Sequence, residues 1–270
     1  MVVQHNLSAI NTNRQMGVVT DALQKSTEKL SSGYKINRAA DDAAGLSISE
    51  KMRSQIRGLN KASDNAQDGI SLIQVAEGAL NETHSILQRM NELATQAAND
   101  TNTSVDRQSI KDEIKQLNEE LDRISSTTQF NKQDLFTGGF SGKLQVGALE
   151  GQTMDVKISL AVSAKGLKVS AVEVSTNAKA GAAMQSIQDA IESVSKQRSK
   201  LGAIQNRLEH TINNLDTNAE NTQAAESRIR DTDMADEMVQ YSKNNILSQA
   251  GQSMLTQANQ QTQGVLSLLQ

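Results

Sequence analysis

Apolar residues recur every seven positions at the start of the chain, at Val2, Ala9, Met16, Leu23 and Leu30. This spacing is typical of the narrow apolar seam of a coiled-coil helix. A similar seam lies at the other end of the chain and comprises Leu247, Ala250, Met254, Ala258, Val265 and Leu268. The polar Gln261 interrupts it. Such a thin stripe buries little apolar surface, so its helix needs a partner to offset the entropy cost of ordering. We expect the opposite end of the chain and neighbouring chains to supply that partner.

Three stretches between these ends follow the helical period. Apolar residues form a broad stripe over 41–99, step by four and three over 104–125, and return in a similar rhythm over 184–215. The chain contains no proline, so nothing forces a kink in these stretches. The pattern therefore predicts a mainly α fold, a long antiparallel helical bundle with coiled-coil ends.

The pattern changes over residues 137–176, where glycines cluster and apolar residues alternate with polar ones. This alternation predicts a small central β-hairpin region. Its first arm is expected at Leu144 and Val146. Two further strands are expected, one at Met154, Val156, Ile158 and Leu160, and another at Leu167, Val169 and Ala171. We expect the phenylalanines at the junction of helix and hairpin to form a local core: Phe130, Phe136 and Phe140.

Composition removes several classes of function. The absence of cysteine excludes disulfides, thiolate nucleophiles and cysteine-ligated zinc. The net charge of −4 argues against nucleic-acid binding, which requires a basic face. No apolar run reaches the length of about 18 residues that a membrane-spanning helix needs. The opening segment MVVQHNLSAINTNRQ lacks the basic and apolar regions of a cleavable secretion signal.

Catalytic motifs are missing as well, since HExxH, GxSxG and GxxxxGK[ST] do not occur. Asp41 and Asp42 precede an apolar-periodic run, so we interpret them as helix caps. We interpret Glu119 and Glu120 as a solvated helix face, and His84 as a packed or surface histidine. The sequence thus predicts a protein that is not an enzyme, that needs no cofactor or metal, and that acts through surfaces for packing on copies of itself.

Eight segments, in order along nearly the whole chain, carry motifs of a known family. They are LSSGYKIN (30–37), DDAAGLSIS (41–49), GLNKASDNAQDGISLIQVAEGALNE (58–82), LQRMNELATQAAND (87–100), TQFN (128–131), LQVGALEGQTMDV (144–156), RIRDTDMADEM (228–238) and QANQQTQGVLSLLQ (257–270). Through these segments the chain resembles bacterial flagellins, the subunits of the flagellar filament. It departs from the family pattern at Tyr34, where leucine is commoner, and at Thr262, where proline is frequent. Thr262 keeps its backbone N–H, so the last helix is free to continue.

The resemblance implies two layers around the filament axis. Residues 1–42 and 231–270 would form an inner coiled coil. Residues 43–230 would form an outer helical domain with the hairpin region at 137–176. Many flagellins insert large outer domains in that region, and this chain is too short there to hold one.

The family's biology supplies expectations about location and partners. Flagellins leave the cell unfolded through the flagellar type III channel, with an uncleaved N-terminal signal, and polymerise in the extracellular flagellum. The implied partners are other copies of the chain, an export chaperone, a cytosolic assembly factor, the hook-junction proteins and the cap.

The resemblance to flagellins also implies a binding site. Many flagellins present a patch on the outer helical layer that Toll-like receptor 5 of the host binds. The matching positions are Arg89, Leu93 and Glu113, with Gln96 beside them. Arg89, Leu93 and Gln96 are spaced by four and three residues, which places them on one face of a helix.

Two other functions remain as alternatives. A hook–filament junction protein has similar termini, although the continuous central match and the terminal QANQ…VLSLL run favour flagellin. A secreted coiled-coil adhesin or effector is the second alternative. Polymerisation into long filaments separates flagellin from both.

Overall fold

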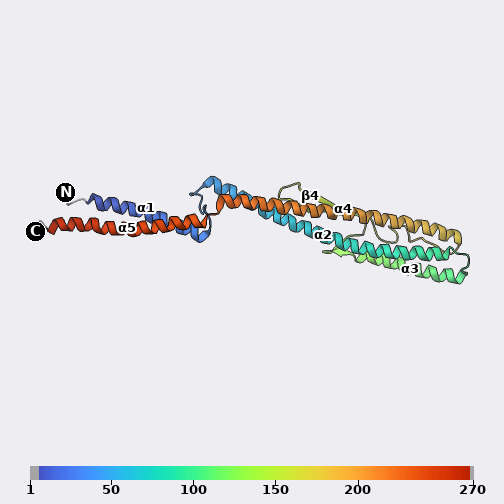
Figure 1. Ribbon diagram of the computed structural model, residues 1–270. Coiled ribbons are helices and arrows are strands. Elements are labelled where there is room, and N and C mark those ends of the chain that lie inside the picture. The colour runs from blue at the N-terminus through green and yellow to red at the C-terminus, as the bar shows by residue number, and fades with distance from the viewer. Residues whose placement is uncertain (1–5, 268–270) are drawn as a thin grey trace. The chain divides into compact units, whose positions relative to one another are not determined.

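A computed structural model describes residues 6–267, with side chains described up to 261 (Figure 1). Five helices account for most of that range: α1 (Leu7–Ser32), α2 (Ala43–Ala97), α3 (Ser104–Thr127), α4 (Asn177–Arg230) and α5 (Met234–Ser267). The mainly α prediction is confirmed. Helix α4 is longer at both ends than the stretch 184–215 whose apolar rhythm revealed it.

The chain folds as two compact units. One comprises the two chain ends, up to Ser54 and from Asn221, and the other comprises Gln55–Glu220. These limits fall inside α2 and α4, so each of these long helices contributes to both units. The expected division at 42/43 and 230/231 concerns the layers of an assembled filament and stays a prediction.

Three helices build the core of the Gln55–Glu220 unit: α2, α3 and α4 (Figure 1). Their buried apolar residues follow helical spacing. The fully buried ones include Ile73, Leu80, Leu87, Met90, Leu121, Ile187, Val194, Leu201 and Leu208. Helices α2 and α4 are antiparallel, since Ser63 donates a hydrogen bond to Asp216 at 3.0 Å and Arg198 lies 3.7 Å from Glu77. Leucine, isoleucine and alanine thus form a core that contains only one fully buried aromatic ring, Phe136.

Side-chain caps fix where the helices begin. The Asp42 carboxylate accepts the Gly45 backbone N–H at 2.9 Å, which confirms its predicted cap on α2. Asp41 does not cap this helix. Its carboxylate accepts the backbone N–H groups of Arg38 at 3.0 Å and Asn37 at 3.2 Å, and these bonds lower the pKa of Asp41. Only one of the two adjacent aspartates can occupy the N-cap position, and the other closes the preceding turn.

The predicted hairpin is formed by β3 (Phe140–Gln145) and β4 (Thr153–Ile158), which pair antiparallel with Leu144 opposite Met154. Met154, Val156 and Ile158 face the core, as the alternation predicted, whereas Leu160 lies beyond the strand. A second, shorter pair joins β1 (Gln129–Phe130) to β2 (Gln133–Asp134). Phe136 is buried, and Phe130 and Phe140 pack partly buried against the same core, which agrees with the predicted local core.

The strand predicted at Leu167, Val169 and Ala171 is wrong. The backbone turns here, because Leu167 N–H donates to Ser163 O and Val169 N–H donates to Ala164 O, both at 2.9 Å. Leu167 and Val169 are nevertheless buried. Alternating apolar residues reflect alternating burial, and an irregular segment that lies on a helical core produces the same pattern.

Substitution of Leu80 by alanine tests the helical core. Leu80 is fully buried, and Val105, on the first turn of α3, is 73% exposed. We expect Leu80→Ala to lower the free energy of unfolding by about 2–5 kcal/mol, through lost burial and the cavity left behind. Val105→Ala, the matched control, should change it by about 0.5 kcal/mol or less. Urea denaturation followed by helical circular dichroism measures both, and equal effects would contradict this assignment of the core.

Candidate functional site

The histidine and glutamates singled out in the sequence lie on helix surfaces and in ion pairs. No group of three or more histidine, aspartate or glutamate residues within them is placed to hold a metal ion. His84 is half-buried on α2, with its Nε2 at 3.0 Å from the Gln88 amide nitrogen. The pKa of Glu120 is lowered by hydrogen bonds from Arg123, which suits a solvated ion pair and not a general acid.

The two chain ends pair along their length, α1 against α5 (Figure 1). The Asn6 side-chain amide donates to Ala258 O at 2.9 Å, and Lys29 lies 3.5 Å from Glu237. Tyr34 and Asp231 form an antiparallel bridge beyond these contacts. Residue numbers rise along α1 as those of their partners fall along α5, so the two helices are antiparallel and pair in one register.

Both helices of this pair show the alternating three- and four-residue steps of a coiled coil. In α1 the residues that are at least half-buried at these steps are Ala9, Thr12, Met16, Val19, Leu23, Ser26 and Leu30. In α5 they are Glu237, Tyr241, Asn244, Ser248, Gly251, Leu255 and Ala258. The seam of α5 is thus largely polar or small, unlike that of α1. Small residues allow close approach, and Gly251 lies directly beside the Met16 side chain.

The predicted seam residues divide accordingly. Ala9, Met16, Leu23 and Leu30 face α5 and are half-buried, and Ala258 is buried on the opposite helix. Leu247 and Met254 do not face α1, being 44% and 58% exposed. Each lies one position before the residue that does, Ser248 and Leu255 respectively. Val2 and Leu268 lie outside the described residues, and the side chain of Val265 lies outside them too.

The sides of this helix pair that face away from the seam are apolar as well. Val239 and Ile246 are seven residues apart, as are Leu247 and Met254, and each of the four is exposed. On α1 the exposed apolar residues lie opposite the seam at about 100° per residue. They are Leu7, Ile10 and Val18. We call these seven residues the outward apolar rows.

The four residues carried over as a receptor patch lie at the α2–α3 contact. Arg89 donates from Nη2 and Nε to the Glu113 carboxylate at 2.8 and 3.0 Å, and a further bond reaches Glu92. These bonds raise the pKa of Arg89. Arg89 is half-exposed and Gln96 is exposed, whereas Leu93 is only 2% exposed and belongs to the core. In this chain Leu93 packs in the core beneath Arg89 and Gln96, and its side chain is too buried to contact a partner.

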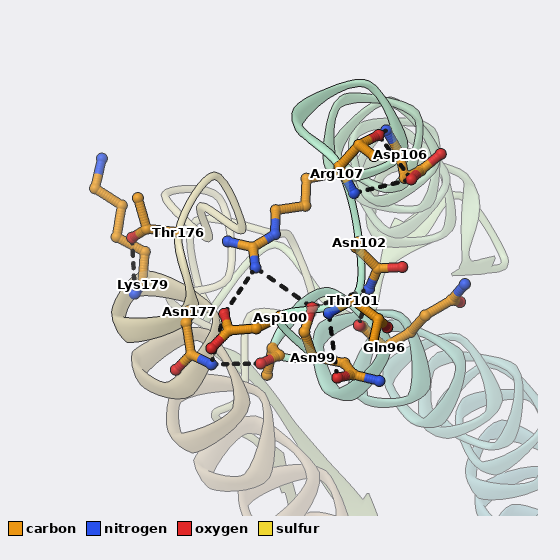
Figure 2. Close-up of polar contacts among 12 residues, drawn as sticks. Gln96, Asn99, Asp100, Thr101, Asn102, Asp106, Arg107, Thr176, Asn177 and Lys179 are labelled. Carbon is orange, nitrogen blue, oxygen red and sulfur yellow. Dashed lines mark hydrogen bonds and ion pairs between the residues drawn. The ribbon is translucent and has the colours of Figure 1, made fainter.

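A set of polar contacts that the sequence did not predict closes the turn between α2 and α3 (Figure 2). Arg107 donates to Asn99 O at 3.3 Å and to the Asp100 carboxylate at 3.2 Å. Asn177, at the start of α4, donates to the same carboxylate at 3.4 Å. Thr103 and Asp106 form a capping box that begins α3. The Thr103–Asp106 spacing was the one available signal, since the Arg107 and Asn177 contacts need the folded turn.

No helix among the described residues is long and apolar enough to cross a membrane.

Two family models and several known proteins match this chain. The family model of the bacterial flagellin N-terminal helical region matches residues 3–141, and that of the bacterial flagellin C-terminal helical region matches residues 184–269. The chain is 55% identical over 271 residues to a flagellin of Halalkalibacterium halodurans and 50% identical over 304 residues to a flagellin of Bacillus subtilis, with 100% of both chains covered each time. The crystal structure of Bacillus cereus flagellin is 34% identical with a TM-score of 0.51, and the match covers 60% of this chain and 94% of that one.

Two leucine substitutions test which residues hold α1 and α5 together. We expect Leu23→Ala to speed amide exchange in both helices by about tenfold, the factor produced by about 1.4 kcal/mol of lost stability. Leu247→Ala should change exchange by about twofold or less, since its side chain faces away from α1. Hydrogen exchange of the dilute chain by mass spectrometry measures both. Equal acceleration in the two variants would place Leu247 in the seam.

Proposed function

This chain belongs to the bacterial flagellin family, and on that premise we propose that it is a structural subunit that polymerises into the flagellar filament. The flagellins of Halalkalibacterium halodurans and Bacillus subtilis support this, since each match covers 100% of both chains. Since the family that matches is one of structural proteins, we propose no catalytic activity.

The outward apolar rows are the observation that carries polymerisation. The exposed large hydrophobic residues of the described chain concentrate on α1 and α5, the two helices that pair with each other. Exposed apolar surface in rows at heptad spacing marks a face that packs against another helix. A neighbouring copy would bury residues such as Ile246 and Leu247, each worth about 1.5–3 kcal/mol when fully covered.

The layered arrangement follows from this packing. Residues 1–42 and 231–270 would form the inner layer, where each helix pair is surrounded by pairs from other copies. Residues 43–230 would form the outer layer, with the hairpin region 137–176 on it. The outer part needs less support from neighbours, because its helices already bury a continuous core of their own.

Export and location are part of the same proposal. The chain would leave the cell unfolded through the flagellar type III channel and act in the extracellular flagellum. An export chaperone, a cytosolic assembly factor, the hook-junction proteins and the cap are the expected partners. The lack of cysteine suits an oxidising exterior, and the lack of proline removes isomerisation steps of about 10–100 s from refolding at the filament tip.

Binding of Toll-like receptor 5 is a second proposed property. Its support is the half-exposed Arg89, whose guanidinium the Glu113 carboxylate holds in place at the surface. Arginine held in a fixed position is frequent at the centre of protein interfaces. Gln96 extends the same face, and Leu93 packs beneath it.

Substitution of the outward rows tests polymerisation. We expect the double variant Leu247→Ser, Met254→Ser to raise the critical concentration for seeded polymerisation by about tenfold or more, because two apolar side chains lose their burial. Sedimentation of filaments after salt-induced, seeded growth measures it, and electron microscopy verifies the filament form.

The matched control is Val105→Ser, which replaces an apolar residue of greater exposure outside α1 and α5. It should polymerise at the wild-type critical concentration. A wild-type chain that caps seeds without extending them would favour the hook–filament junction alternative. A chain that does not interact with seeds at all would favour the adhesin or effector alternative.

Signalling by receptor-expressing reporter cells tests the patch. We expect Arg89→Ala to reduce the potency of the soluble chain by about tenfold or more, the usual effect of truncating a central interface arginine. Arg123→Ala is the control, since Arg123 is also exposed and also pairs with a glutamate, Glu120. Leu93→Ala is a poor probe because the loss of a buried leucine would destabilise the fold. Equal potency of Arg89→Ala and wild type would remove this patch from the proposal.

A further inference from the structure

We infer that Arg230 and Tyr34 form a clasp that sets the register of α5 against α1, and that Arg230 is thereby a positioning residue for assembly. The inference rests on the proposed filament function. Its basis is the side-chain and backbone geometry where the connector after α1 meets the connector before α5, within the unit formed by the chain ends.

The first contact joins the two side chains directly. The guanidinium carbon of Arg230 lies 4.7 Å from the centre of the Tyr34 ring. That distance is within the range of a cation–π interaction, in which the ring face attracts the positive charge. Both residues are half-buried, which strengthens the attraction because less water competes for the charge.

Backbone hydrogen bonds join the same two segments. Lys35 N–H donates to Arg230 O at 2.7 Å, and Thr232 N–H donates to Gly33 O at 3.0 Å. Tyr34 and Asp231 pair between these bonds as an isolated antiparallel bridge. Gly33 ends α1 in the left-handed region at φ 75°, which directs the chain into this bridge.

The other side of Arg230 is held as well. Its Nη1 donates to Ser49 Oγ at 3.5 Å, and the fully buried Ser49 hydroxyl donates to the Glu226 carboxylate at 2.9 Å. The Nε of Arg230 is shielded from solvent and has no hydrogen-bond partner among the described residues. The guanidinium is thus enclosed by a ring face, a hydroxyl and a nearby carboxylate, which fixes its position.

Apolar burial alone holds the register of α5 against α1 weakly, because the α5 side of the seam is built largely of polar or small residues such as Asn244, Ser248 and Gly251. Specific contacts must add to it, as Asn6 with Ala258 and Lys29 with Glu237 do farther along the pair. A heptad seam tolerates a slip of seven residues unless a specific contact prevents it. Only Asp231–Asp233 separate the end of α4 from the start of α5, so fixing Arg230 fixes where α5 begins.

The register decides where the outward apolar rows of α5 lie relative to those of α1. A neighbouring copy must meet both sets at once, so a slipped pair is not competent to add to the filament. The apparent affinity for addition falls with the fraction of chains that hold the competent register.

Four full-length variants test the clasp. Tyr34→Leu removes the ring, and Tyr34→Phe keeps it. Arg230→Gln removes the charge under the ring, and Arg228→Gln removes an exposed charge from the same last turn of α4. The readouts are amide exchange at Lys35 and Thr232 in the soluble chain, and the critical concentration for seeded polymerisation.

We expect Tyr34→Leu and Arg230→Gln each to speed exchange at both amides and to raise the critical concentration by about fivefold, the scale of one partly buried cation–π contact. Tyr34→Phe and Arg228→Gln should match wild type in both readouts. Wild-type critical concentrations for Tyr34→Leu and Arg230→Gln would overturn the inference, whether or not exchange changes. Loss of function in Tyr34→Phe equal to that in Tyr34→Leu would overturn the role of the ring. Failure of wild type to polymerise is a separate result, which would contradict the proposed function itself.

Discussion

The long helices of this chain depend on one another for stability, because a helix in water gains most of its stability from packing its apolar residues against a neighbour. With no tryptophan and only three phenylalanines, the chain has few large side chains to fill a core in one step. Burial must come from many leucine, isoleucine and alanine contacts spread along helix lengths. Helices α2, α3 and α4 satisfy this requirement among themselves. Helices α1 and α5 satisfy it only in part, since their seam is half-buried and their outer sides are apolar.

That difference connects the fold to the proposed function. A helix pair with apolar residues on both its inner and outer sides is an incomplete bundle, and further helix pairs complete it. Copies of the same chain are the natural source, because each brings the same rows at the same spacing. The filament would then be held together by the part of the subunit that is least complete alone, while the Gln55–Glu220 unit keeps a core of its own.

Much of this fold was predictable from the sequence, and the failures have physical causes. The apolar rhythm revealed α2 and α3 because the residues that they bury recur at helical spacing. The strand expected at Leu167 and Val169 failed because alternation reports burial and not backbone conformation. On α5 the apolar spacing selected Leu247 and Met254, whereas the intrachain seam uses Ser248 and Leu255. A search for apolar periodicity finds the faces that await partners as readily as those already covered.

The candidate sites show the same limit. The residues proposed for receptor binding lie on two helices in contact, and motif matching gave no sign that Leu93 among them is buried. The Tyr34–Arg230 contact joins residues 196 positions apart in the sequence, so no local pattern predicts it. Contacts between distant segments depend on the register of long helices, which single-sequence patterns leave open.

A high-resolution electron cryo-microscopy map of filaments grown from the purified chain would show what covers the outward apolar rows. We expect α1 or α5 of neighbouring copies to cover Val239, Ile246, Leu247 and Met254, with α1 and α5 of each copy paired as in the single chain. Filaments in which these four residues face solvent or an open channel would contradict this expectation.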